Sequence, residues 1–154
     1  MPRHPERAGA IAALLDERGL SHARRSRGEP LAPDTDVLLA DTLGEVGLFA
    51  RLADTVYLGG GHAPGVGGHN PLEILRLGTP VVTGPHVFNF EDTRRELEER
   101  PGYTVIGTPE DLARGFPFAP PSSETIQFIE DTARAPMEAT VNALMPRLPK
   151  APRT

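Results

Sequence analysis

The sequence predicts an α/β protein in which a parallel β-sheet is flanked by helices. Short apolar runs alternate with segments of helical spacing, and turns rich in glycine or proline separate them. The length of 154 residues suits one domain with its own core and is short for two complete domains. We expect that domain over residues 1–135, followed by a C-terminal helix and a frayed tail over residues 136–154.

The first third of the chain is expected to form a helix, two strands and a second helix. Apolar residues recur at helical spacing within residues 5–19, before a glycine. The arginine-rich segment 21–26 is expected to be an edge strand, and the apolar run 37–40 a strand covered on both faces. Thr42 and Glu45 then form the pattern of a capping box, which predicts a helix start.

The rest of the chain repeats this alternation of strands and helices. Further strands are expected at residues 55–58, 80–83 and 103–106. Short helices are expected after residues 70, 89 and 108, and a last helical region after the proline-rich connector 116–121. Asn89 is expected to cap the second of these helices, and Pro136 to kink or break the last one.

Composition excludes several classes of function. The formal net charge of −5 is unlike the basic surface of a nucleic-acid binder, so no nucleic-acid partner is expected. There is no cysteine, which excludes disulfides and thiol chemistry. No apolar run approaches the roughly 18 residues of a membrane helix, so a role at a membrane would depend on another segment or a partner.

The glycine-rich segment after the third expected strand is the clearest candidate binding site. Residues 59–69 contain six glycines and lead into Asn70, Pro71, Leu72 and Glu73. Glycines let a ligand approach the backbone, and the start of a helix offers free amides to a phosphate. This predicts a loop that holds a phosphate group of a ligand. The alternative is a long turn in which Asn70 caps the helix and Glu73 closes a capping box.

Two other groups of residues are weaker candidates. Leu43, Gly44 and Glu45 lie in the connection between an expected strand and the next expected helix, although Glu45 also fits a plain capping box. Arg3, next to Pro2, precedes a helix and is suited to neutralising a phosphate, although a terminal arginine is usually solvated. Neither group is specific when taken alone.

The sequence gives little sign of metal or nucleophilic chemistry. His62, His69 and His86 lack the spacing of a zinc motif, so no metal site is expected; His69 fits a polar contact to sugar or phosphate better. No serine–histidine–acid arrangement or Walker-type lysine is visible. We therefore expect no catalytic residue and no cofactor in this chain.

Four segments, in this order, resemble the 3-deoxy-D-manno-octulosonic acid (Kdo) transferases. They are PRHPER at residues 2–7, DVLLADTLGEVGLF at 36–49, GGHNPLE at 67–73 and GPHVFNF at 84–90. The resemblance implies a GT-B type glycosyltransferase whose C-terminal, Rossmann-like half binds the donor CMP-Kdo. It implies substrate-binding roles for Pro2, Arg3, Leu43, Gly44, Glu45, Gly68, His69, Asn70, Pro71, Leu72 and Glu73.

Other parts of the family pattern have no counterpart in the sequence. The resemblance implies an N-terminal domain that binds the lipid A precursor, carries the general base and associates with the cytoplasmic face of the bacterial inner membrane. That domain and the first strand of the donor domain are not found. We therefore expect this part alone to be soluble, inactive in sugar transfer, and prone to self-association through a vacant strand position.

Alternatives to this interpretation remain open. One is a fragment of another GT-B protein, such as a transferase with a UDP-sugar donor or a sugar epimerase. The other is a nucleotide-binding module without enzymatic activity. Binding of CMP in preference to UDP and UMP separates the leading hypothesis from the first alternative, and no binding of CMP at millimolar concentration would favour an inert fragment.

Overall fold

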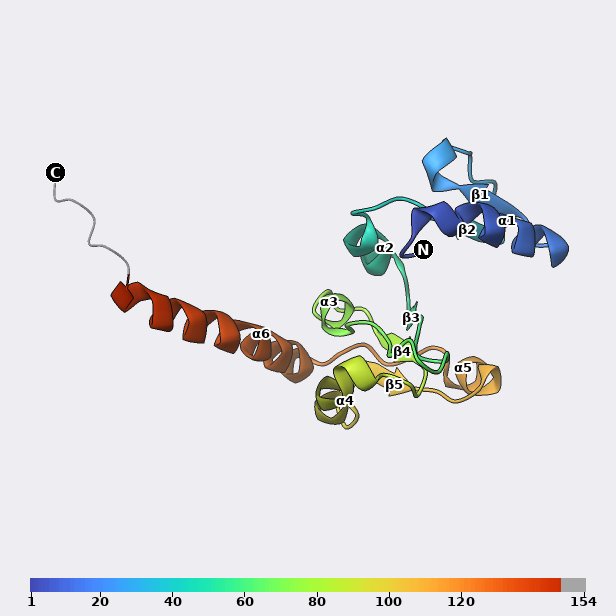
Figure 1. The fold of residues 1–154 in the computed structure, drawn as a ribbon. Coiled ribbons are helices and arrows are strands. Elements are labelled where there is room, and N and C mark those ends of the chain that lie inside the picture. The colour runs from blue at the N-terminus through green and yellow to red at the C-terminus, as the bar shows by residue number, and fades with distance from the viewer. Residues whose placement is uncertain (148–154) are drawn as a thin grey trace, which may run out of the picture. The chain divides into compact units, whose positions relative to one another are not determined.

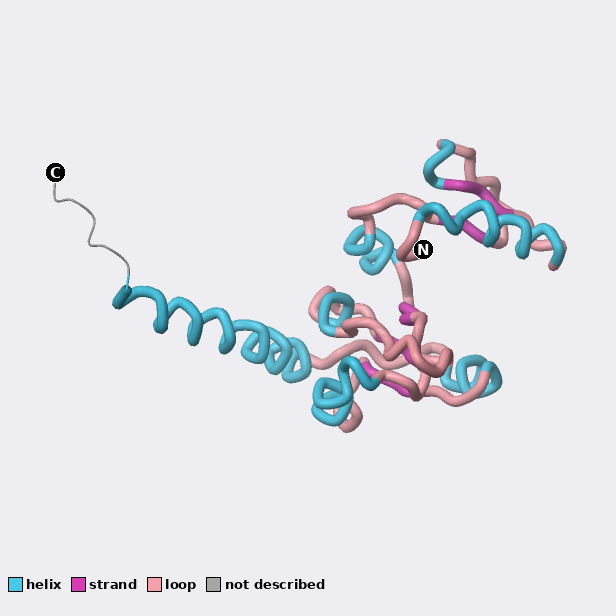
Figure 2. Tube along the Cα trace, in the orientation of Figure 1, coloured by secondary structure: helices cyan, strands magenta, loops and turns pink. Residues whose placement is uncertain are grey.

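The computed structural model describes residues 1–147, in which short parallel strands alternate with helices (Figures 1 and 2). The chain divides into two compact units, Met1–Phe49 and the part from Ala50 onward, and each is described by itself. None of the helices within residues 1–147 combines the length and apolar character needed to cross a bilayer. The expectation of one donor-binding domain over residues 1–135 stays a prediction.

The first unit contains the predicted helix followed by two parallel strands. The elements are η1 (Pro5–Arg7), α1 (Ala8–Glu17), β1 (His22–Arg24), η2 (Arg25–Arg27) and β2 (Val37–Leu39), and α2 (Val46–Leu52) begins here. Ala23 of β1 pairs with Leu38 of β2, and the strands run in the same direction. A glycine at position 19, with φ of +67°, follows α1 as the sequence predicts.

The strand β2 is less covered than its apolar sequence predicts. Leu39 is buried, but Val37 and Leu38 are only half-buried. The reason is topological: within residues 1–147, β1 and β2 pair only with each other, so each has one unpaired edge. Unpaired edges are sites where another strand can add. The expected self-association through such an edge stays a prediction.

The second unit is built on a three-stranded parallel sheet. Its strands are β3 (Val56–Leu58), β4 (Val81–Thr83) and β5 (Tyr103–Val105), in the order β3-β4-β5. All three residues of the central strand β4 are buried, which confirms the predicted buried strand. The helical elements are α3 (Leu72–Leu75), η3 (Phe88–Phe90), α4 (Glu91–Leu97), α5 (Pro109–Gly115), α6 (Ser123–Leu144) and η4 (Met145–Arg147).

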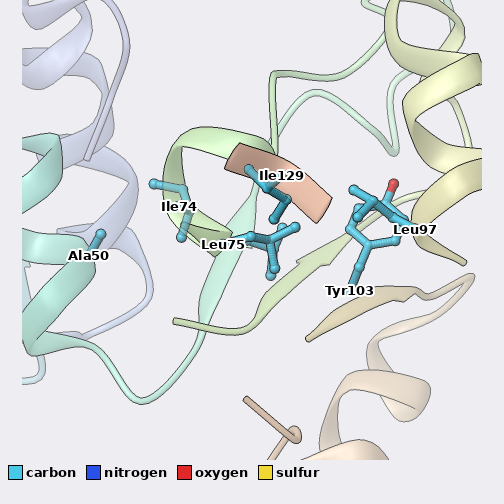
Figure 3. Packing of buried hydrophobic residues seen from close by; sticks show 7 residues of the cluster. Ala50, Ile74, Leu75, Leu97, Tyr103 and Ile129 are labelled. Atoms are coloured by element: carbon cyan, nitrogen blue, oxygen red, sulfur yellow. The ribbon is translucent and has the colours of Figure 1, made fainter. Parts of the chain in front are cut away.

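Helices from several parts of the chain pack around this sheet to form the core of the second unit. Leu75 of α3, Leu97 of α4 and Ile129 of α6 are at most 1% exposed and cluster with Val81 and Tyr103 of the sheet (Figure 3). These apolar contacts hold the carboxyl ends of the strands, and the loops that follow them, in place.

The last helix is not broken at Pro136, which was one of the two expected effects of this proline, and a kink there stays a prediction. The helix α6 continues through Pro136 to Leu144 and is not broken there. Residues 131–147 are all exposed, so the carbonyl that loses its hydrogen bond to the proline can bond to water instead. The predicted frayed tail falls mainly on residues 148–154, which lie outside the described residues.

Candidate functional site

The glycine-rich loop, residues 59–69, leaves the carboxyl end of β3 and packs against residues 83–89. A Cβ atom at Gly61 would lie 2.5 Å from Thr83 Oγ1 and 2.8 Å from the backbone nitrogen of Gly84. At Gly68 it would lie 2.8 Å from Val87 Cγ1. A Cβ atom at Gly67 would be equally crowded, by the side chains of Phe88 and Asn89. The close approach of two chain segments therefore accounts for three of the six glycines without a ligand.

Backbone conformation explains other glycines of the same loop. Gly60, Gly65, Gly67 and Gly68 have φ values of +84°, +89°, +85° and +75°, which side chains other than glycine adopt only with strain. The sequence argument was that so many glycines indicate space for a ligand. The structure corrects this argument, because turning and internal packing already require most of them.

Residues 84–89 tether the glycine-rich loop through hydrogen bonds. The backbone nitrogen of His86 donates to the Gly61 carbonyl at 2.7 Å. Asn89 donates twice, from its backbone to Gly67 O at 3.3 Å and from Nδ2 to Val66 O at 3.2 Å. The prediction that Asn89 caps the next helix is therefore wrong, since α4 begins at Glu91 without a side-chain cap. Sequence spacing alone did not identify Asn89 as a support of the loop.

Asn70 and Glu73 serve different purposes at the end of the loop. Asn70 Oδ1 accepts a hydrogen bond from the Leu72 amide at 3.0 Å and so supports the helix start, but the N-cap position of α3 is held by Pro71 and not by Asn70 as expected. Glu73 does not close a capping box: its side chain is exposed and has no hydrogen-bond or ion-pair partner within residues 1–147. The helix α3 is only four residues long, so its dipole contributes little to anion binding. The exposed carboxylate of Glu73 is therefore the group of this segment that can accept from a ligand.

The remaining expected residues of this segment lie around that carboxylate. Pro71 is buried, while His69 and Leu72 are half-buried. The ring of His69 lies over Gly60, because a Cβ there would approach His69 Nε2 to 3.3 Å. The Nδ1 of His62 shares a 2.5 Å hydrogen bond with the Tyr57 hydroxyl. No cluster of three potential metal ligands occurs in the described part of the chain.

In the first unit, Glu45 is occupied by protein groups. Arg25 Nη2 donates to Glu45 Oε1 at 2.8 Å, and the Thr42 hydroxyl donates to the same carboxylate. The hydrogen bond from Arg25, followed by that from Thr42, holds the pKa of Glu45 below its usual value. The predicted capping box with Thr42 at the N-cap is wrong, because α2 begins only at Val46 and Thr42 lies four residues before it.

The other expected residues of the first unit are accessible. Pro2 is half-buried and Arg3 exposed just before η1, and Leu43 is 76% exposed. Gly44 has a φ of +80°, and a Cβ placed on it would meet no atom within 4 Å. These residues and Glu45 belong to the first unit, whereas residues 68–73 belong to the second.

Asp41 organises the loop that carries Thr42 and Glu45, and the sequence argument gave it no role. It is 4% exposed and accepts from Arg24 Nε at 3.0 Å and Nη2 at 2.7 Å. Ser26 adds hydrogen bonds from its backbone nitrogen at 2.9 Å and its hydroxyl at 2.7 Å. The bonds from Ser26, supported by those from Arg24, lower the pKa of Asp41 well below its usual range although burial acts to raise it. A carboxylate directly after an apolar strand was the available signal for a paired, buried charge.

Known proteins are similar to this sequence over about two thirds of its length. The chain is 49% identical over 98 residues to a 3-deoxy-D-manno-octulosonic acid transferase of Bordetella pertussis and 40% identical over 111 residues to one of Haemophilus influenzae. The matches cover 62% and 72% of this chain but only 22% and 26% of those proteins. The chain thus spans about a quarter of the curated relatives. No protein-family model matches it.

A solved structure shares the fold. It is described as the C-terminal CMP-Kdo binding domain of WaaA from Acinetobacter baumannii. The similarity has a TM-score of 0.70 at 32% identity and covers 74% of this chain and 59% of that one. This confirms the predicted fold class of parallel strands flanked by helices, as in the C-terminal half of a GT-B protein.

Proposed function

Because the chain is homologous to the Kdo transferases, we propose that it is the donor-binding part of a glycosyltransferase that uses CMP-Kdo. The observation that carries the proposal is the identity of 49% over 98 residues to a member of that family. The structural similarity to a CMP-Kdo binding domain supports CMP-Kdo as the donor. The acceptor is a lipid A precursor, and the complete enzyme acts at the cytoplasmic face of the bacterial inner membrane.

In this proposal the loops described above hold the nucleotide. Arg3 neutralises phosphate, and the backbone around Gly44 lies against the ligand. Glu73 accepts hydrogen bonds from the ribose hydroxyl groups, which suits its exposed and unpaired carboxylate. His69 and Asn70 to Leu72 complete the contact. No metal and no cofactor is required by the proposal. The contribution of this donor-binding part to catalysis is stabilisation of the charge on the departing CMP.

Calorimetric titration with CMP tests the proposal. We expect the chain to bind CMP, and Arg3→Ala and Glu73→Ala each to weaken binding by about tenfold or more, because each removes a charge-assisted contact. Arg134→Ala and Glu110→Ala are matched controls, since both side chains are exposed and lie outside the proposed site. Equal or tighter binding of UMP would favour a uridine-nucleotide enzyme, and no binding at millimolar CMP would favour an inert module.

The purified chain is not expected to transfer sugar. The proposal places the general base and the acceptor site in parts of the enzyme beyond the quarter that the chain matches. Incubation with CMP-Kdo and a lipid A precursor should therefore leave the precursor unchanged by mass spectrometry, whereas a full-length relative modifies it. A Kdo-modified product formed by residues 1–154 alone would contradict this assignment.

A further inference from the structure

Arg25 lies where the loops after two parallel strands meet. It follows β1 directly, and Glu45 lies in the segment after β2. The guanidinium spans the carboxylate, with Nη2 at 2.8 Å from Oε1 and Nε at 3.3 Å from both carboxylate oxygens. The carboxyl ends of parallel strands are where α/β proteins usually bind their ligands.

The two partners of this ion pair differ in what they still offer to a ligand. Both oxygens of Glu45 already accept hydrogen bonds, from Arg25 and from Thr42, and its side chain is only 23% exposed. The Arg25 side chain is 49% exposed, and its Nη1 donates to no group within the described residues. A ligand therefore meets a free donor at Arg25 and an occupied acceptor at Glu45.

We infer that Arg25, and not Glu45, contacts the phosphate of the nucleotide in this region. Glu45 is then a positioning residue that holds the guanidinium in one orientation. An arginine has five N–H donors in a planar fork, so it can bind a carboxylate and a phosphate together. Because Glu45 already orders the side chain, less rotamer entropy is lost when the phosphate binds. The inference rests on the proposed function, since it assigns a further contact to the same nucleotide.

Comparing CMP with cytidine tests this contact, because the two ligands differ only in the phosphate. For the full chain we expect Arg25→Gln to lower the affinity for CMP by about tenfold or more in calorimetry and to leave the affinity for cytidine unchanged. Arg27→Gln is the matched control. The Arg27 side chain is 62% exposed and pairs with Glu29 at 3.6 Å, so its replacement should change neither affinity. Arg25→Lys keeps the charge but not the fork, so an intermediate loss for CMP alone is expected.

The role of Glu45 is tested with the same pair of ligands. Glu45→Gln should leave the affinity for cytidine unchanged. If Glu45 instead contacted the ribose hydroxyls directly, the substitution would lower the affinity for cytidine. The inference is overturned if Arg25→Gln weakens both ligands equally, as a merely structural role would, or weakens neither. If the wild-type chain binds neither ligand, the proposed function and this inference fail together; CMP binding that is insensitive to Arg25→Gln refutes the inference alone. Far-UV circular dichroism checks that the variants fold.

Discussion

Asp41→Asn is expected to lower the free energy of unfolding of the first unit by about 2–3 kcal/mol. The carboxylate accepts from four donors, two on Arg24 and two on Ser26, at 2.7–3.0 Å. An asparagine has one acceptor oxygen and turns its amide hydrogens toward another donor. It also leaves the Arg24 guanidinium, whose side chain is 15% exposed, without its counter-charge.

The effect of Asp41→Asn has a defined pH dependence. The pKa of Asp41 is lowered in the folded protein relative to an unfolded value of about 3.9. A lowered folded pKa stabilises the protein above the unfolded pKa, and this contribution is lost as the pH falls below about 4. The difference between wild type and Asp41→Asn should therefore be full at neutral pH and shrink in acid.

Hydrogen exchange at the amides of β1 and β2, combined with denaturant titration, measures this difference. Asp34→Asn is the matched control in the same unit: its side chain is exposed, and the substitution should change stability by less than about 0.5 kcal/mol. A difference between wild type and Asp41→Asn that stays the same at pH 3 and pH 7 would show that the Asp41 charge does not support the loop.

The order of the secondary structure could be predicted from local signals. Apolar runs predicted β4 and β5 correctly. The helix expected after residue 108 is present and begins with a capping box, in which the Asp111 amide donates to Thr108 Oγ1 at 3.2 Å. These features depend on residues within a few positions of one another. The coverage of β2 depends on how many strands surround it, which its own sequence does not encode.

Local contacts around the candidate site could be predicted better than contacts between distant parts of the chain. Asn70 was correctly expected to support the helix start because its hydrogen bond reaches only two residues along the chain. The partners of Glu45 and Asp41 come from Arg24, Arg25 and Ser26, which are 15 to 20 residues away in sequence. Only the parallel pairing of β1 with β2 brings these residues together, so their charges could not be matched in advance.

Gly61→Ala is expected to destabilise the second unit by about 1–3 kcal/mol. The added Cβ would lie 2.5 Å from Thr83 Oγ1, 2.8 Å from Gly84 N and 3.0 Å from Gly84 O. Two of these atoms belong to the backbone, so the clash cannot be relieved by turning a side chain. Relief requires the loop to move off residues 83–89, which would also strain the hydrogen bond from His86 N to Gly61 O.

Gly59→Ala is the matched control, two residues earlier in the same loop. Its Cβ would meet no atom within 4 Å, and its φ is not in the left-handed region, so no strain is expected. Alanine restricts the unfolded chain, and the variant should be as stable as wild type or more stable by about 0.4–1 kcal/mol. Thermal and denaturant unfolding of both variants gives the comparison. If neither alanine lowers the stability, the loop is not packed on residues 83–89. Its glycines would then again indicate space for a ligand.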